Sequence, residues 1–192
     1  MAMSKSDRDY IMLSFALTEG RRALDNLAEV ERLAALRVET QPGVEVRENR
    51  RVFDQIRLGL QVAANVSRLF WPPRNIARGA HLRSLTGLPE THGLSDRSLR
   101  NHIEHLDERL DAWTATSPRP FLTMELVLHD DDAEPEAMRA EVVDATAIVY
   151  DAQSRLVHLF GDTFSLPSLR RDLEDVMEKT SQALMTKVRA WK

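Results

Sequence analysis

Apolar residues recur at steps of three and four over most of this chain, the spacing that places them on one face of an α-helix. Only 7 glycines occur in 192 residues, so little interrupts the periodic runs. In the first run, residues 7–39, the expected buried stripe consists of Ile11, Phe15, Leu17, Leu24, Leu27, Val30, Leu33 and Leu36. The pattern predicts a mainly α protein.

Turn and cap signals divide the periodic runs into separate helices. Pro42-Gly43 forms a turn, and Pro72-Pro73 ends a helix because proline disfavours helix at the residue before it. Ser95 is the expected N-cap of a later helix, with Asp96 adding negative charge to its first turn. Pro167 opens the last helix. The expected helices cover about 7–39, 45–70, 75–87, 96–114 and 167–191.

The sequence pattern changes from helical to strand-like over residues 121–161. Residues 121–128 are expected to form a strand, and 145–150 with 154–160 a hairpin. The acidic stretch 129–136 is expected to be a connection. The predicted fold is one domain, residues 1–192: a helical bundle with a small antiparallel β insertion before its last helix.

Composition narrows the functional classes. The chain has no cysteine, which excludes disulfides, thiolate zinc sites and a cysteine nucleophile. Twenty-six basic against 30 acidic residues give a net charge of -4, which argues against binding nucleic acid by bulk charge alone. The charged start lacks the apolar core of a signal peptide, and no stretch has the length of a membrane span. We therefore expect a cytoplasmic protein that does not insert into membranes.

The expected helix 96–114 carries the residues most suggestive of chemistry. On a helical projection, its apolar members fall on one core-facing seam: Leu99, Ile103, Leu106, Leu110 and Trp113. Asn101 and His105, one turn apart, project away from this seam, and Arg100 lies on the exposed arc. One helix is thus expected to bury one face and present arginine, asparagine and histidine from the rest.

This arrangement resembles the signature of the HEPN superfamily, which is an arginine, four to six intervening residues and a histidine, often with asparagine directly after the arginine. Arg100-Asn101-His102-Ile103-Glu104-His105 has that form. The neighbouring pair Arg97 and His102 has the same spacing, so the working arginine is either Arg97 or Arg100. Some family members carry a modifiable tyrosine two residues after the histidine, where this chain has Asp107.

The resemblance implies a metal-independent RNA endonuclease that needs no cofactor. The family generally forms homodimers in which two copies of the motif line one cleft, and many members are toxins or defence proteins with an antitoxin or partner protein. His105 would act as general base or acid, since histidine changes charge near neutral pH. Arg100 would bind the scissile phosphate, and Asn101 would orient His105 or bind phosphate.

Basic residues precede the motif. Residues 66–101 contain six arginines and two acidic residues. Such a segment is expected to follow a phosphate backbone, with the RNA-binding candidates Arg74, Arg78, Arg83, Arg97 and His102. The alternative is that these arginines pair with acidic groups on other helices.

The same residues allow interpretations other than a nuclease. A catalytically inactive HEPN-like dimer that serves as a binding or assembly module is the main alternative, and an ordinary surface helix in which Arg100 pairs with Glu104 is another. A metal site at His102 and His105 would need a third ligand, for example His81 or His92, which the sequence does not place. Trp71 and Trp113 are expected in the core or at a dimer interface.

Overall fold

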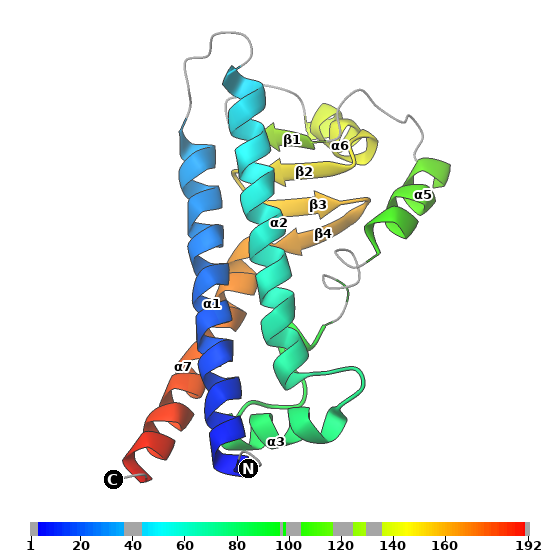
Figure 1. Ribbon diagram of the computed structural model, residues 1–192. Helices are drawn as coiled ribbons and strands as arrows, with labels where there is room; N and C mark the ends of the chain where they lie inside the picture. Colours follow the sequence, from blue (N-terminus) through cyan, green and yellow to red (C-terminus); the bar gives the residue numbers. More distant parts are fainter. Residues whose placement is uncertain are drawn as a thin grey trace. The chain divides into compact units, whose positions relative to one another are not determined.

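A computed structural model of the chain describes residues 4–36, 44–96, 98, 105–116, 125–129 and 136–190, with side chains except at 44–48, 136–139 and 190. It is mostly helical, with a small sheet before the last helix, as the sequence predicts (Figure 1). The elements in chain order are α1 (Lys5–Ala35), α2 (Val44–Phe70), α3 (Ile76–Thr86), the 3-10 turn η1 (Gly93–Ser95), α5 (Leu106–Thr116), β1 (Glu125–Leu128), α6 (Glu136–Ala145), β2 (Ile148–Asp151), β3 (Leu156–Leu159), β4 (Asp162–Ser165) and α7 (Leu166–Ala190).

The chain folds into two compact units. The first contains Met1–Asn26, Leu58–Arg97 and Ser168–Lys192, and the second contains Leu27–Arg57 and Ser98–Pro167. Helices α1 and α2 are long, and each contributes one part of its length to the first unit and the other part to the second.

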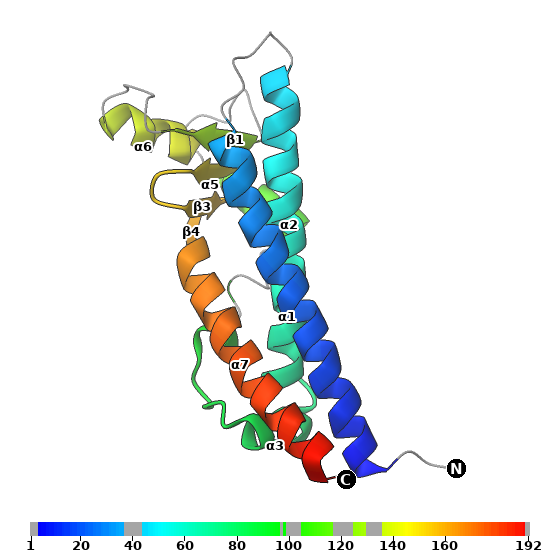
Figure 2. The same cartoon turned by 90° about the vertical axis from the view of Figure 1, so that its left-hand side faces the viewer.

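The first unit is built from the early part of α1, the later part of α2, and α7 (Figure 2). Polar contacts fix the neighbours: the Asn65 side chain donates to Glu19 at 2.8 Å between α2 and α1, and the Lys187 ammonium donates to Asp9 at 3.0 Å between α7 and α1. The apolar interior of this unit includes Leu13, Ala16, Ala23, Leu60, Ala63, Val66, Phe70, Leu82, Leu173 and Val176.

The stripe expected on α1 is only partly correct. Ile11 and Phe15 are about half exposed, as is Leu36 at the end of the helix. In the first unit the buried face of α1 is instead marked by Leu13, Ala16, Ala23 and Gly20. Smaller side chains on this face allow a close approach between helices, since Gly20 lies directly beside the Met177 side chain of α7.

The second unit is centred on a four-stranded sheet with the order β1-β2-β3-β4. Both faces of the sheet carry buried apolar side chains: the strand registers place Val127, Ile148, Tyr150, Val157 and Leu159 on one face and Leu128 and Val149 on the other. Ion pairs join Arg57 of α2 to Glu125 of β1, and Arg155 to Glu31 of α1. These contacts hold the sheet to the parts of α1 and α2 that belong to this unit.

The sequence prediction for the β region is correct for the hairpin and wrong in two respects. Strands β2 and β3 pair antiparallel as expected, but β1 pairs parallel to β2, so the sheet is mixed. The parallel pair requires a crossover connection, and α6 supplies it, in a stretch to which the sequence assigned no element beyond the expected connection 129–136. A further strand, β4, follows a tight turn at Phe160 and Gly161, whose φ angles are 50° and 87°.

Helix α3 packs tightly onto the end of α2 at a glycine. A β-carbon built at Gly79 lies 2.4 Å from Pro72 Cδ and 2.7 Å from the Phe70 carbonyl oxygen. The Gly79→Ala change is therefore expected to lower the free energy of unfolding by about 1–3 kcal/mol, although alanine is normally the better helix residue. Urea unfolding measures the change.

Ser84→Ala is the matched control, because Ser84 lies on the exposed side of the same helix. This variant is expected to unfold within about 0.5 kcal/mol of the wild type. Equal or greater stability of Gly79→Ala would contradict the close packing of α3 on the end of α2.

Candidate functional site

His105 is the one expected catalytic residue that the structure describes. It lies in the turn immediately before α5, where its carbonyl oxygen accepts a hydrogen bond from the Arg109 N–H at 3.0 Å. Its side chain is 51% exposed. Arg97, Arg100, Asn101 and His102 lie outside the described residues. His105 is thus presented at the start of a helix, open to a ligand.

A carboxylate faces one side of the His105 ring. Glu108 Oε1 lies 3.4 Å from His105 Nδ1, in an i, i+3 pair. The other ring nitrogen, Nε2, makes no hydrogen bond to any residue in the part of the chain that the structure describes. One ring nitrogen is therefore close to a group that can orient it, while the other is available for proton transfer.

The acidic residues beside His105 also have a local structural role. Asp107 and Glu108 occupy the first turn of α5, where negative charge interacts favourably with the unpaired N–H groups of a helix start. Both side chains are exposed. Their presence is consistent with helix stabilisation and does not require a metal ion.

Helix α5 is anchored near its C-terminal end, and its apolar seam does not extend to its first residue as the sequence predicts. Trp113 is buried and packs edge-on against Phe160, with ring centroids 6.4 Å apart. Leu106, expected in the same seam, is 48% exposed. The expected N-cap is also wrong: Ser95 ends η1, and Asp96 is extended. Among the described residues, α5 is also joined to β4 by Arg109 and Asp162, 4.0 Å apart.

The arginines expected to bind RNA have different environments. The Arg78 guanidinium donates to the Arg68 carbonyl oxygen at 2.9 Å, and Arg83 donates to the Phe70 carbonyl oxygen. Both acceptors lie in the last turn of α2, whose carbonyl groups lack helical partners. Arg74, by contrast, is exposed. Arg78 and Arg83 therefore cap α2, a role that differs from both expected alternatives.

We predict that Arg83→Gln destabilises the fold, whereas Arg74→Gln leaves it unchanged. Loss of the Arg83 cap is expected to lower the free energy of unfolding by about 1–2 kcal/mol, because charged donors at a helix C-terminus satisfy its carbonyls and dipole. Thermal and urea unfolding of the two variants provide the comparison. Identical unfolding curves for both would show that the Arg83 contact contributes nothing.

Sequence reasoning missed two carboxylate-centred clusters in the first unit. Asp9, whose side chain is 9% exposed, lies 3.0 Å from both His81 Nε2 and Lys187 Nζ. Asp175 lies 3.3 Å from His92 Nε2 and 2.8 Å from Lys179 Nζ. His81 and His92 were expected only as possible zinc ligands or stacking groups. No sequence signal joins them to aspartates more than 70 positions away.

Both aspartates hold their charge more strongly than usual. Burial raises the pKa of Asp9, but hydrogen bonds from Lys187 and His81 outweigh it, so the net pKa lies below the ordinary value. The hydrogen bond from Lys179 is the main reason that the pKa of Asp175 is also lowered. A carboxyl group with a lowered pKa stabilises the fold above its unfolded pKa, and this contribution disappears as the pH falls through the folded value.

Because the pKa of Asp9 is lowered by folding, its contribution to the free energy of unfolding depends on pH. Asp9→Asn is expected to be less stable than the wild type at pH 7, and the difference is expected to shrink as the pH falls below about 4, the unfolded pKa, toward the lowered pKa of the folded carboxyl. Urea midpoints at pH 7 and pH 3 measure it, with the exposed Asp25→Asn on the same helix as control. A deficit of equal size at both pH values would contradict the charged role of Asp9.

His158 forms another side-chain pair, on the sheet. Its Nδ1 lies 3.0 Å from the Thr163 hydroxyl oxygen across the β3–β4 pair. Burial lowers the pKa of His158, while the charges of Asp151 and Asp144 partly oppose that effect. The neutral imidazole is thus favoured, and it can accept the threonine hydroxyl hydrogen. The pair is a cross-strand contact of the kind that stabilises neighbouring strands.

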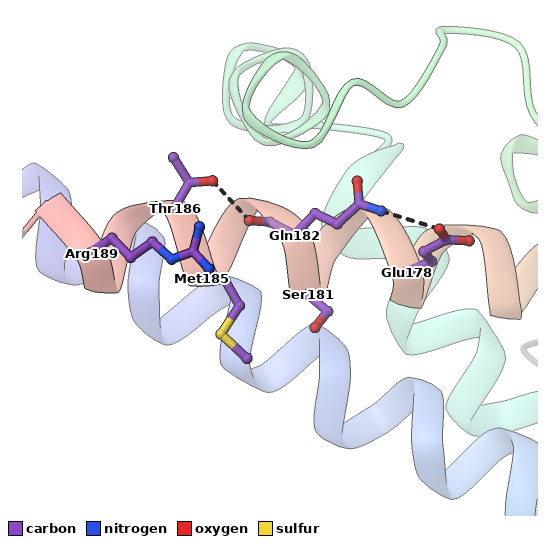
Figure 3. A pocket seen from close by; sticks show the side chains of 6 residues that line it. All are labelled: Glu178, Ser181, Gln182, Met185, Thr186 and Arg189. Atoms are coloured by element: carbon purple, nitrogen blue, oxygen red, sulfur yellow. Dashed lines mark hydrogen bonds between the residues drawn. The ribbon is translucent and has the colours of Figure 1, made fainter.

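A shallow hollow of about 450 Å³ follows the outer side of α7 (Figure 3). All six lining residues come from this helix, and Met185 and Ser181 point toward α1. Gln182 donates to Glu178 at 3.1 Å, so part of its polar surface is already paired. None of the expected catalytic or RNA-binding residues lines it. The lining residues are Glu178, Ser181, Gln182, Met185, Thr186 and Arg189.

Two further properties concern ligands and membranes. Among the described side chains, no group of three or more histidine, aspartate and glutamate residues is placed to hold a metal ion. Likewise, no described helix combines the length and the apolar character needed to cross a bilayer.

Comparison of the chain with protein-family models, with curated proteins and with solved structures finds no match.

Proposed function

We propose that the chain is a metal-independent RNA endonuclease of the HEPN type, in which His105 transfers protons. The observation that carries this proposal is the exposed imidazole of His105, with Glu108 near Nδ1 and Nε2 available. It is supported by the mainly helical fold and by the motif from Arg100 to His105. Under this proposal the bundle is HEPN-like and acts in the cytoplasm, where RNA is accessible.

The reaction requires one proton to be removed from the ribose and one to be added to the leaving oxygen. A base removes the proton from a ribose 2′-hydroxyl, the 2′ oxygen bonds to phosphorus, and the bond from phosphorus to the 5′ oxygen breaks as that oxygen takes up a proton. The products are a 2′,3′-cyclic phosphate and a 5′-hydroxyl. His105 can carry out either transfer, as base toward the 2′-hydroxyl or as acid toward the 5′ oxygen, and water completes the other.

Glu108 and the motif residues complete the site. The Glu108 carboxylate would favour the imidazolium that forms when Nε2 accepts a proton, because opposite charges 3.4 Å apart attract. Arg100 would hold the scissile phosphate through its planar fork of donors, and Asn101 would orient His105 or bind phosphate. The homodimer, and an antitoxin or defence-system partner, follow from the family resemblance.

A second candidate has one observation in its favour. Ile11 and Phe15 lie one turn apart on α1 and are both about half exposed. Exposed apolar side chains at this spacing are typical of a helix face that binds another protein. This supports a catalytically inactive dimeric binding or assembly module, which needs the helical scaffold and not His105.

Cleavage of RNA in EDTA by purified protein tests the nuclease. His105→Ala is expected to reduce the rate at least about 100-fold, the lower limit for loss of a general acid or base. Glu108→Gln is expected to reduce it about three- to fivefold, because an exposed pair of opposite charges contributes up to about 1 kcal/mol. Mass spectrometry should identify the cyclic phosphate end.

Asp107→Asn is the matched control: it removes an equally exposed carboxylate one position from Glu108 and is expected to keep the rate within about twofold. Circular dichroism confirms that each variant is folded. EDTA-resistant cleavage that persists in His105→Ala would overturn the assignment of His105. A folded wild-type dimer that cleaves no RNA would favour the assembly module.

A further inference from the structure

Residues 76–96, comprising α3, the following loop and η1, form a strap on the first unit, which we call the α3–η1 strap. Figure 2 shows this segment beside α7. It is attached at two places by the same arrangement of groups. In each, one aspartate of the helical core contacts a histidine of the strap and a lysine of α7.

The first bridge is His81–Asp9–Lys187. Asp9 uses separate oxygens for its partners: Oδ1 lies 3.0 Å from His81 Nε2, and Oδ2 lies 3.0 Å from Lys187 Nζ. The carboxylate is nearly buried, while His81 is about one-third exposed. Removal of either partner would leave a poorly hydrated charge, so the bridge favours the closed position of the strap.

The second bridge is His92–Asp175–Lys179. Asp175 Oδ2 lies 3.3 Å from His92 Nε2 and 2.8 Å from Lys179 Nζ. His92 Nδ1 accepts a hydrogen bond from the Leu94 N–H at 3.1 Å. The ring hydrogen therefore resides on Nε2 in the neutral side chain, which donates it to Asp175.

Packing around His92 fixes the position of its ring in this bridge. Its ring stacks on Trp71 with centroids 5.0 Å apart and an interplanar angle of 14°. Trp71 Nε1 donates to the Glu90 carbonyl oxygen at 2.9 Å, and the Ser67 hydroxyl donates to the Leu94 carbonyl oxygen at 2.6 Å. Backbone and side-chain groups of the loop are thus fixed to α2 as well as to α7.

The strap also buries apolar side chains at Leu82, Leu88 and Leu94. Such contacts are not directional, whereas the two bridges have defined partners. Helix α3 supplies Arg78 and Arg83 to cap α2, so movement of the strap would also uncap that helix. These shared attachments favour opening of the strap as one cooperative piece.

We propose that the α3–η1 strap opens from the α1, α2 and α7 core as a unit, and that the two histidine–aspartate–lysine bridges set how often it opens. The proposal concerns only the first unit and does not depend on the proposed nuclease activity.

Hydrogen–deuterium exchange of the full chain at neutral pH tests it. Asp9→Asn and Asp175→Asn are each expected to accelerate exchange of amides within residues 76–96 by about tenfold or more, because hydrogen bonds to charged groups resist local opening. Amides of β2 and β3 in the second unit should keep their wild-type rates. Asp25→Asn and Glu174→Gln are matched controls, since both remove exposed carboxylates from the same two helices.

His81→Gln gives an independent variant if Asp9→Asn fails to fold, because His81 is more exposed and its loss removes the same bridge. The double variant Asp9→Asn with His81→Gln should exchange no faster than the more affected single variant. The proposal is overturned if strap rates match those of the controls within about twofold, if both units accelerate equally, or if the two substitutions act additively.

Discussion

Burial of the apolar stripes of α1, α2 and α7 against one another is the interaction on which the first unit depends. It provides the interior that contains Leu13, Phe70 and Leu173, all almost inaccessible to solvent. Two buried carboxylates of this interior have partners among the described residues. Glu19 is buried between Asn65 and Arg22, and Asp9 between His81 and Lys187. These pairings compensate for lost hydration and fix the positions of the helices along one another.

The ends of the helices are completed by the segment that follows α2. Arg78 and Arg83 satisfy carbonyl groups of its last turn, while His81 and His92 reach the aspartates of α1 and α7. The basic and aromatic residues that make this segment look like an RNA-binding surface are thus largely engaged within the protein. Arg74 differs, because its side chain is exposed.

The sequence predicts the long helices well, since repeated apolar spacing and proline or glycine signals determine where they run. It fails where spacing does not determine which face is buried. Ile11 and Phe15 have helical spacing, yet the face with Ala16 and Gly20 packs inward because it permits closer contact. The parallel pairing of β1 and β2 was not predictable from local alternation, which does not encode strand direction. Helix α6 is short, and its ten residues do not repeat apolar spacing long enough to predict a helix.

For the candidate site, the sequence supplies the motif and the structure supplies the environment of His105. Its exposure, its position before α5 and the nearby Glu108 oxygen cannot be obtained from spacing alone, because Ser95 and Asp96 have the residue types of a helix start but belong to the end of η1. The contact of α5 with Phe160 likewise depends on a turn that the sequence analysis did not identify.

The most direct test of the proposed function is complementation between two inactive chains, Arg100→Ala and His105→Ala, mixed after separate purification and allowed to exchange subunits. If arginine from one copy and histidine from the other form a shared site, each chain alone is inactive, and an equal mixture recovers about a quarter of wild-type RNA cleavage, since half the dimers then contain one intact site. No recovery, when mass spectrometry shows mixed dimers, would contradict a site shared between two copies.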